Sequence, residues 1–488
     1  MAATRTARST TATRQDEESR MPHGPDRSRR ITLTMLVMLV MTAGLLALRP
    51  AAAGAQTPAH QHAGPPAAAP APLTLADLER MALAHNPTIA QAQADVRAAA
   101  GRKDQAGLYP NPEVGYEARE ISGAPTMNGG EHGFFIQQPI VTAGKLRLSR
   151  AVFAEEQAQA ESVAASQRDR VLTGIRLGFY EALGAQQLVA LRRQLAHIAA
   201  DAVTTSQQLL NVGQADQPDV LEAMVDAQRA ALAVTDAERD QARIWLRLAA
   251  MAGNPSLPLA PLAGSLETGL PQVDRAAALQ TILRDSPEVK AAEQNVVRAR
   301  LGLERARVEK YPDIVVRGGL EYNRQQVDGL TRPIGWVGMA EVGVQVPIFD
   351  RNQGNIAAAT AELTHAEREL DRVKLALTAD FAGPYETYAS DADAVRRYRT
   401  SILPQARQAY ELYLQKYRQM AAAYPQVLVA QRTLFQLRED YLHTLVELWR
   451  AAIEIKGYLR VNGLAAPLAP GEPATVSPGV EVSTPRQP

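Results

Sequence analysis

The histidines of this 488-residue sequence are its best candidates for metal binding and for general acid–base chemistry. His60 and His62 stand one residue apart and offer two imidazole ligands to a transition metal. They lie in a stretch rich in Ala and Pro that forms no closed site, so we interpret them as part of a solvated tail. His197, His365 and His443 fall singly in helical segments, and we interpret them as structural or solvent-facing.

The motifs of common enzyme classes are absent from the sequence. It contains no His-Glu-x-x-His motif, no Gly-rich phosphate-binding loop and no Gly-x-Ser-x-Gly elbow. It also contains no cysteine, which excludes thiol catalysis, disulfide bonds and a lipid anchor on an N-terminal cysteine. The carboxylates are scattered over helix faces, where solvation explains them. We therefore predict a protein that is not an enzyme and that uses no cofactor or bound metal.

Charge and composition narrow the class further. Lys plus Arg and Asp plus Glu number 52 each, so the balance does not indicate nucleic acid or an acidic partner. Aromatic residues make up 5% of the chain. Together with frequent Ala and Gln, this favours long, closely packed helices over a compact mixed core.

The N-terminal region has the pattern of an export signal. Arg29 and Arg30 precede an uncharged run, Ile31 to Leu48, and Ala53-Gly54-Ala55 follows as a cleavage site of the A-x-A type. The alternative is an uncleaved membrane anchor, which the length of the run permits. We predict three regions outside the folded part: a signal peptide with a basic N-terminal extension at 1–55, a flexible linker at 56–72 and a disordered Pro-rich tail at 464–488.

The rest of the chain is a duplication. Pro87 is answered by Pro287, Tyr109-Pro110 by Tyr311-Pro312, and Pro139-Ile140 by Pro347-Ile348, at offsets of 200, 202 and 208 residues. Small changes of offset are expected when loops gain or lose residues. We predict a first repeat at 73–271 and a second at 272–463.

Long helices are predicted on both sides of each pair of strands. Apolar residues at spacings of three or four run from Leu434 to Leu459 and from Leu172 to Ile198. Pro425 stands at the start of the first of these stripes, and Gly463 stands where a left-handed cap is allowed. Further helical segments are expected at 75–106, 218–251, 273–309 and 353–398. Such lengths are typical of bundles, coiled coils or tubes.

Between the helices, apolar and charged residues alternate in four short segments. We predict strands at about 113–121, 131–140, 313–322 and 336–348. A half-buried sheet in a soluble protein would show the same alternation. Each segment is close to the length of about ten residues that a tilted membrane strand needs, which favours membrane strands. Tyr116, Tyr322 and Trp336 lie near strand ends, as interfacial aromatic residues do.

Four strands cannot close a membrane barrel, and an open sheet edge in lipid leaves backbone groups unpaired. Barrels start at about eight strands, and an eight-stranded interior is already filled by side chains. A conducting pore therefore needs at least three copies of the chain. The charged strand face would line its wet channel through five residues: Glu113, Arg119, Arg317, Glu321 and Glu341.

The sequence resembles the TolC family of outer-membrane efflux factors over about residues 73–463. The resemblance is carried by Asn86-Pro87, by Tyr109-Pro110-Asn111-Pro112-Glu113, by Gln138-Pro139-Ile140 and by Pro347-Ile348-Phe349-Asp350-Arg351-Asn352-Gln353-Gly354. The duplicated order of helix, two strands and helix matches as well. The last of these segments and the Asn-Pro-Glu sequence most resemble the heavy-metal cation efflux branch of the family.

This resemblance implies a mainly α fold with a small β part, in which a duplicated long-helix and β-hairpin unit assembles as a homotrimer. Three copies would form a twelve-stranded β-barrel in the outer membrane, continued by a twelve-helix α-barrel across the periplasm. The implied partners are outer-membrane lipid, a periplasmic adaptor protein and an inner-membrane pump of the resistance-nodulation-division type. Nucleic acid is not an expected partner.

In such proteins the tube narrows at a periplasmic tip, where two helix-to-helix turns meet the adaptor. The resemblance places these turns at Asn211–Leu221 and Tyr417–Leu428. Family members commonly carry acidic residues in the second turn. This chain has Gln426 and Val429 where those acids would stand, and Met420 where a glycine is usual.

The first turn keeps the acidic character that the second lacks. Asp219 matches an acidic position of the family, and three copies of Asp216 and Asp219 would form a ring around the aperture. The alternative is that both acids cap the helix that begins at Pro218, although one residue can hold both roles. We predict four aperture residues: Asp216, Asp219, Tyr417 and Gln426.

The function expected from the sequence is a passive duct, the outer-membrane channel of a tripartite efflux system, for small solutes or metal cations. The alternatives are a soluble periplasmic coiled-coil adaptor or scaffold, and an exported hydrolase. The exported substrate stays open between a metal cation and a drug or other solute.

Overall fold

The computed structural model describes residues 72–120, 130–326, 332–419, 421 and 424–467. The predicted signal peptide, nearly all of the predicted linker and the tail beyond Pro467 lie outside these ranges. The described part is mostly helical and contains one small antiparallel sheet, as predicted. No helix in these ranges has the length and apolarity of a membrane span.

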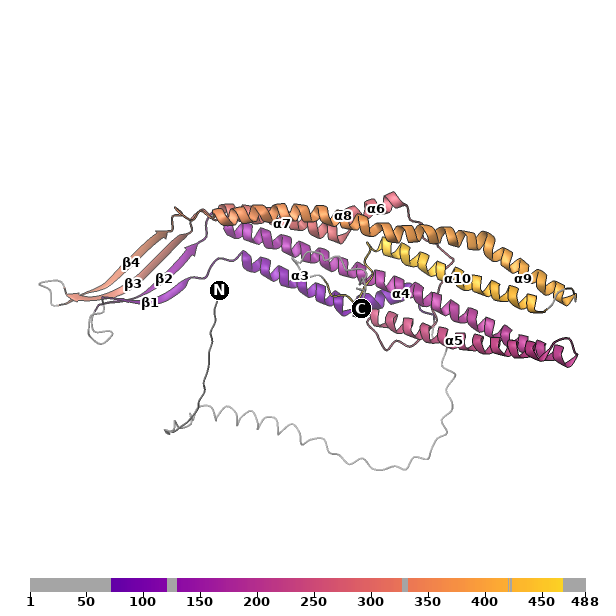
Figure 1. The fold of residues 1–488 in the computed structure, drawn as a ribbon. Helices are drawn as coiled ribbons and strands as arrows, with labels where there is room; N and C mark the ends of the chain where they lie inside the picture. Colours follow the sequence, from indigo (N-terminus) through magenta and orange to yellow (C-terminus); the bar gives the residue numbers. More distant parts are fainter. Residues whose placement is uncertain (1–71, 121–129, 327–331, 420, 422–423, 468–488) are drawn as a thin grey trace, which may run out of the picture. The chain divides into compact units, whose positions relative to one another are not determined.

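The duplication is visible in the order of elements (Figure 1). The first repeat contains α2 (Leu75–His85), α3 (Pro87–Ala106), β1 (Glu113–Arg119), β2 (Glu131–Ile140), α4 (Lys145–Asn211) and α5 (Gln217–Met251). The second contains α6 (Arg275–Asp285), α7 (Pro287–Val308), β3 (Ile314–Gln326), β4 (Pro333–Val344), α8 (Gln353–Arg397), the π-helical turn η1 (Tyr398–Ile402), α9 (Leu403–Arg418) and α10 (Tyr424–Lys456). Each repeat therefore places two strands between helices.

The segments predicted as continuous helices at 75–106 and 273–309 are each interrupted once. Asn86 and Ser286 have extended backbone conformations because each precedes a proline, which disfavours the helical region. Their side chains then cap the next helix: the Thr88 N–H donates to Asn86 Oδ1 at 3.0 Å, and the Val289 N–H donates to Ser286 Oγ at 3.3 Å. The repeated Asn-Pro and Ser-Pro pairs therefore start α3 and α7.

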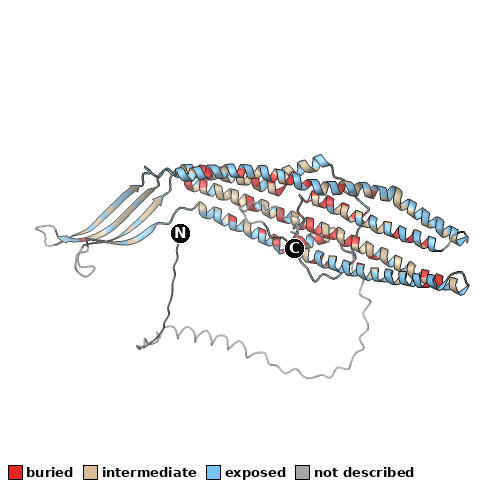
Figure 2. Cartoon of the chain, viewed as in Figure 1, coloured by how far each residue is buried: buried red, intermediate tan, exposed pale blue. Residues whose placement is uncertain are grey.

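Helix α4 is the centre of the helical part and contacts helices of both repeats. Near the strands it packs against α3 and α7, and toward the opposite end against α5 and α10 (Figure 1). At Gly184 an added Cβ would lie 2.4 Å from Val446 Cγ2, so only a glycine allows α10 this close. Buried residues concentrate in the middle of the helices, whereas the strands carry mostly half-buried and exposed residues (Figure 2).

The C-terminal helices differ from the prediction at both ends. The segment expected at 353–398 continues through η1 into α9, where Pro404 removes one backbone donor and loosens the turn before it. Helix α10 ends at Lys456, and the left-handed residues that follow are Tyr458 and Leu459, with φ of 56° and 63°. Gly463 is not the cap that we predicted, because the chain has already left the helix.

The sheet has the order β1-β2-β3-β4 with every pair antiparallel. Strand β1 ends two residues before the predicted end, because Glu120 has a φ of 55°. Strand β3 runs on to Gln326, beyond the predicted end at 322. Strand β4 begins at Pro333 and ends at Val344 rather than at 348. The Ile348 N–H bonds to the Val346 carbonyl at 3.0 Å, so the chain turns there instead of extending.

Candidate aperture and channel lining

The first predicted tip turn connects α4 to α5 at the end of the helices that lies away from the strands (Figure 1). Gly213 has a φ of 71°, which permits the reversal, and Asp216 is the N-cap of α5. The Asp219 carboxylate accepts a hydrogen bond from the Asp216 N–H at 3.1 Å. Asp219 thus caps the helix, which begins at Gln217, and its charge lies beside the positive end of the helix dipole.

A cleft of about 720 Å³ separates this turn from the second one. It is lined by residues of α4, α5, α9 and α10, which include Asp219, Glu222, Asp226, Tyr417, Tyr424 and Arg432. The structure therefore brings together two of the four predicted aperture residues, Asp219 and Tyr417. Asp216 does not line this cleft, and Gln426 lines a separate cleft of about 440 Å³ with Tyr413 and Val429.

An ion pair across the tip cleft was missed by the sequence analysis. Arg432 of α10 forms an ion pair with Asp226 of α5, and its guanidinium lies 3.9 Å from the Glu222 carboxylate. The pair joins the first repeat to the second. A sequence signal exists, because Asp219, Glu222 and Asp226 recur at spacings of three and four and so share one face of α5.

Two tyrosines form the aromatic wall of the cleft. The rings of Tyr417 and Tyr424 have centroids 5.2 Å apart and are tilted by 46°. Burial raises the pKa of the Tyr424 hydroxyl above its ordinary value, and Tyr417 raises it further. The Tyr424 phenol is therefore neutral at physiological pH. Met420, which stands where a glycine is usual in the family, lies outside the described residues.

The register of the sheet places all five predicted lumen residues on one face. Residues paired across strands point to the same side, and one row runs through Glu113, Gln137, Arg317 and Glu341. A second row contains Glu321, and a third contains Arg119. The opposite face is apolar and exposed. It includes Val114, Phe134, Leu320, Trp336 and Val342, each at least 62% exposed.

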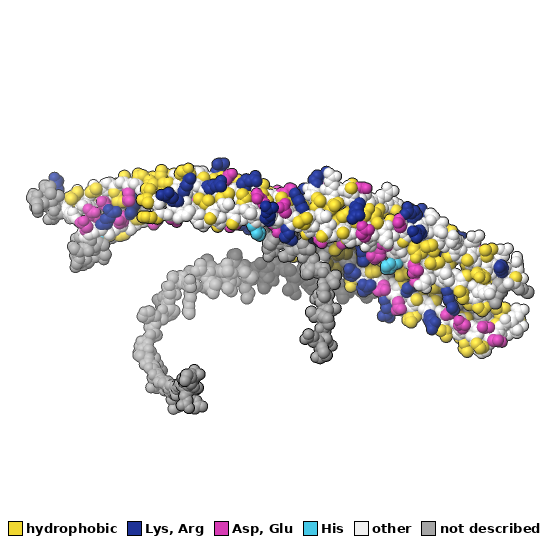
Figure 3. Space-filling model, turned by 45° about the horizontal axis from the view of Figure 1, so that its top comes forward, with side chains coloured by type: hydrophobic (Ala, Val, Ile, Leu, Met, Phe, Trp, Pro, Cys, Tyr) yellow, Lys and Arg dark blue, Asp and Glu magenta, His cyan; other side chains and the backbone are white. Residues whose placement is uncertain are grey.

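Glu117, which we left out of the predicted lining, organises the charged face. It accepts a hydrogen bond from Arg119 Nε at 2.5 Å and also pairs with Arg317 from β3, across β2. Arg317 in turn lies over the Phe135 ring at 4.0 Å. In the strand region of Figure 3, acidic and basic side chains lie together beside an apolar surface.

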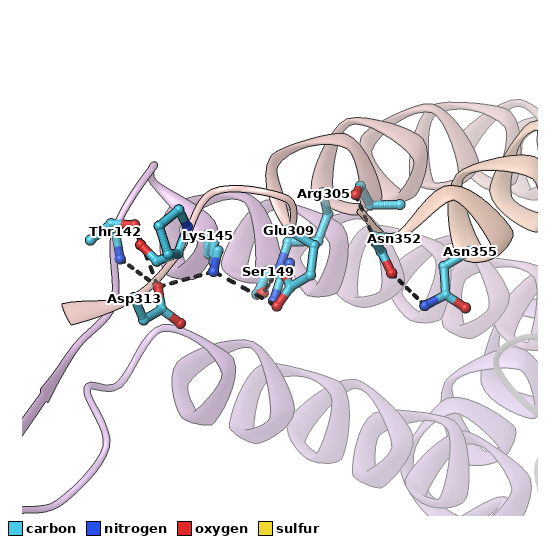
Figure 4. Close-up of polar contacts among 10 residues, drawn as sticks. Thr142, Lys145, Ser149, Arg305, Glu309, Asp313, Asn352 and Asn355 are labelled. Atoms are coloured by element: carbon cyan, nitrogen blue, oxygen red, sulfur yellow. Dashed lines mark hydrogen bonds and ion pairs between the residues drawn. The ribbon is translucent and has the colours of Figure 1, made fainter. Parts of the chain in front are cut away.

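A polar cluster joins the strands to the helices (Figure 4). Lys145, at the start of α4, is 4% exposed, and its Nζ lies 3.0 Å from Asp313 Oδ1 and 3.8 Å from Glu309 Oε1. The Thr142 N–H donates to Asp313 Oδ1 at 2.9 Å, and the Thr142 hydroxyl donates to the Pro312 carbonyl at 2.6 Å. The turn after β2 is thereby fixed to the turn before β3.

The histidines do not converge in the part of the chain that the structure describes. His197 lies on the surface with Nδ1 3.0 Å from Asp201 Oδ2, and His365 borders a different cleft, between α7 and α8. Within the described ranges, no group of three or more His, Cys, Asp or Glu side chains is arranged to hold a metal ion. His60 and His62 lie outside the described residues. The arrangement offers charged surfaces and clefts.

The chain is similar to known proteins over both repeats. A model of the outer membrane efflux protein family matches residues 78–254 and 278–459, which covers both repeats. The cobalt-zinc-cadmium resistance protein CzcC of Cupriavidus metallidurans is 28% identical over 394 residues, which are 80% of this chain and 90% of that protein.

Two solved structures share the fold. The structure of CusC has a TM-score of 0.66 and 16% identity, and the match covers 80% of this chain and 92% of that one. The outer-membrane channel OprN has a TM-score of 0.64 and 18% identity, and the match covers 80% and 91% of the two chains.

Proposed function

Because the chain belongs to the outer membrane efflux protein family, we propose that three copies of it form a passive, gated duct through which solutes leave the cell. The protein is the outer-membrane channel of a tripartite efflux system, as the resemblance to the TolC family predicted. The observation that carries the detailed proposal is the two-faced sheet, with its charged face on one side and its exposed apolar face on the other. Family membership favours the channel over the periplasmic adaptor or scaffold.

The proposed duct has a membrane part and a periplasmic part. Three four-stranded sheets would close into a twelve-stranded barrel, with the apolar face toward lipid and the charged rows toward water. The helices would continue the barrel as a twelve-helix tube. The two repeats, at about 73–271 and 272–463, would then act as similar sectors of a pseudo-six-fold ring, after residues 1–55 have served as the export signal.

The aperture would lie at the tip, where α5 and α10 meet across the cleft. Opening it requires these helices to separate, which breaks the contact of Arg432 with Asp226 and uncovers Tyr417. Three copies of Asp216 and Asp219 would add negative charge at the entrance, and Gln426 leaves the second turn neutral there. A periplasmic adaptor and an inner-membrane pump of the resistance-nodulation-division type would supply the force and the energy.

The proposed cargo is a metal cation. CzcC, which matches over most of both chains, is by its name a cobalt-zinc-cadmium resistance protein. The lumen face carries Glu113, Glu117, Glu131, Glu321 and Glu341 against Arg119 and Arg317, so its net charge attracts cations.

Deletion of the gene tests this proposal. The deletion strain should become sensitive to cobalt, zinc or cadmium salts and regain resistance when the gene is restored. Sensitivity to organic toxins alone would contradict the metal assignment and keep the duct. Unchanged sensitivity to both classes would contradict the efflux function.

A further inference from the structure

The two outer strands of the sheet each leave one edge unpaired within the described chain. Strand β1 pairs with β2 and β4 pairs with β3, so the far edges expose backbone N–H and C=O groups that lipid cannot satisfy. On the face opposite the charged rows, side chains at both edges are apolar and exposed, with Val114 at 72% and Val342 at 70%. In the trimer of the proposed function, on which this inference rests, β4 of one copy meets β1 of the next.

The pairing inside the chain is a template for this pairing between copies. The contact of β2 with β3 joins the first repeat to the second, and the contact of β4 with β1 would join the second repeat to the first repeat of the next copy. Pro139 corresponds to Pro347, and Pro110 corresponds to Pro312. In the observed sheet, Gly133 of β2 pairs with Glu321 of β3. Their counterparts at the same offsets are position 341 in β4 and position 119 in β1, so these two positions should lie opposite each other between copies.

We propose that Glu341 of each copy forms an ion pair with Arg119 of the partner subunit. The pair completes a closed ring of alternating charge around the lumen. Within one copy Glu117 bonds both Arg119 and Arg317, and Arg317 stands opposite Glu341 in the register. Adding the contact between copies continues the order Arg, Glu, Arg, Glu from each subunit into the next without a break.

Registers shifted by two residues must be considered, because the two hairpins of the chain differ by that amount. Glu113 pairs with Gln137 in the β1–β2 hairpin. The corresponding residues of the β3–β4 hairpin are Val315 and Gln345, but Val315 pairs with Gly343 instead. Registers two residues away keep the apolar face toward lipid and must therefore be compared.

One of these neighbouring registers brings like charges together. It sets Glu341 opposite Glu117 of the partner subunit, a destabilising arrangement in cross-strand pairs. Within the described residues Glu341 has no ion pair, whereas Arg119 shares its one acid with Arg317. The proposed register gives Glu341 the partner that it lacks and gives Arg119 a second acidic partner.

Barrel closure excludes the other neighbouring register. A row of paired residues runs from Glu113 through Gln137 and Arg317 to Glu341, and the proposed pair leads it to Arg119 of the partner subunit, six residues beyond Glu113. The row therefore rises by six residues, at about 3.3 Å each, over four strands that lie about 4.8 Å apart. This rise corresponds to a strand tilt of about 45° from the barrel axis. A shift to position 121 gives about 54°, which exceeds the tilt of about 35–45° in membrane barrels.

The turns next to the strands extend the same template. Lys145 and Asp313, which pair inside the chain, correspond to Gln353 and Asn111. The matching contact between copies would therefore join two neutral amides. Phe349, at the same junction, is 90% exposed in the isolated chain, as expected of a residue that the neighbouring copy covers.

Cysteine cross-linking tests the register on the full-length protein in outer membranes, because the chain has no cysteine of its own. Ala118→Cys with Val342→Cys, and Arg119→Cys with Glu341→Cys, should each give reducible dimers and trimers on mild oxidation. Both pairs are needed because successive pairs alternate in backbone geometry. The matched controls, Ala118→Cys with Ala340→Cys and Ala118→Cys with Val344→Cys, report the registers two residues away and should cross-link weakly.

Charge removal tests the ion pair itself. Arg119→Gln and Glu341→Gln should each lower the temperature at which the trimer dissociates by several degrees, and the double variant should lose less than the sum of the two, because each single variant already removes the contact between copies. Native mass, measured on the same samples, distinguishes a failure of the proposed register from a failure of the proposed trimer. A trimer that cross-links in a shifted register, or in which the two single losses simply add, overturns the inference and leaves the duct intact. A monomer overturns the proposed function and the inference with it.

Discussion

Lys145 Nζ and Asp313 Oδ1 lie 3.0 Å apart, and this ion pair joins the start of α4 in the first repeat to the residue before β3 in the second. The lysine is almost fully buried, although the positive end of the α4 dipole is a poor place for a cation. Its two acidic neighbours, Asp313 and Glu309, offset that cost (Figure 4). The pair therefore fixes the sheet to the helices.

Replacement of Lys145 should loosen this junction. Lys145→Met leaves the Asp313 carboxylate without its charged partner, and we expect a loss of about 1–3 kcal/mol in the free energy of unfolding. Urea denaturation in detergent, followed by circular dichroism, measures it. Arg150→Met is the matched control, because Arg150 and Asp104 form an exposed pair on neighbouring helices and should cost at most about 0.5 kcal/mol. Equal losses in the two variants would contradict the assignment.

Removal of the contact across the tip cleft should favour the open state. Arg432→Ala abolishes the pair with Asp226, which is partly exposed, so we expect about 1 kcal/mol and on the order of a fivefold larger open fraction. The measurement is single-channel open probability in planar bilayers.

A pair between α4 and α5, away from the cleft, supplies the control. Arg193 of α4 lies 2.6 Å from Glu238 of α5, within one repeat. Arg193→Ala should leave the open probability unchanged. If it opens the channel as much as Arg432→Ala does, the contact at the tip is not specific.

Two substitutions of Asp219 separate its capping role from its charge. Asp219→Asn keeps a side-chain acceptor for the Asp216 N–H but removes three charges from the trimer, so cation selectivity should fall while stability changes little. Asp219→Ala should reduce both, with a cost of about 1 kcal/mol in unfolding. Reversal potentials in a salt gradient and thermal unfolding report the two effects. If cation selectivity is unchanged in Asp219→Asn, the residue caps the helix and does not contribute to selectivity.

Asp391 on α8 should make the protein more stable in mild acid. Burial raises the pKa of its carboxyl above the ordinary value of 3.8, and Glu447 raises it further, while His443 opposes the shift. Its Oδ2 accepts no hydrogen bond from the described residues. The folded state therefore holds this proton more tightly than the unfolded state does, and stability rises as the pH falls through the raised pKa toward 3.8.

Asp391→Asn should therefore increase the midpoint of thermal unfolding at pH 7 and reduce the gain in stability that accompanies a fall in pH from 7 toward 3.8. Asp393→Asn, on the exposed side of the same helix, is the control and should change neither quantity. A parent protein that loses stability over this pH range while Asp391→Asn does not would reverse the sign and contradict the assignment.

The sequence predicted the parts of this fold that follow from local periodicity. Alternation located all four strands and the charged face, and the paired prolines located the repeats. The strand ends were less predictable, because the turn at Ile348 depends on a backbone hydrogen bond to Val346 rather than on residue type. The helix end at Lys456 was missed because Tyr458 and Leu459, not a glycine, take the left-handed conformation.

The site was predictable only in part, for a physical reason. Asp219 and Tyr417 were predicted as aperture residues from their positions in the family, and they share a cleft. The pair of Arg432 with Asp226 spans two repeats that lie about two hundred residues apart, so neither residue is conspicuous within its own helix. Glu117 was overlooked because its role comes from the register, which brings Arg317 of β3 within reach across β2.

The central claim is that three copies of this chain form a duct in the outer membrane. The most direct test is the native mass of the protein extracted with detergent from separated outer membranes. We predict a heat-sensitive species of three chain masses, confined to the outer-membrane fraction. A single-chain species recovered from the soluble periplasm without detergent would contradict the account.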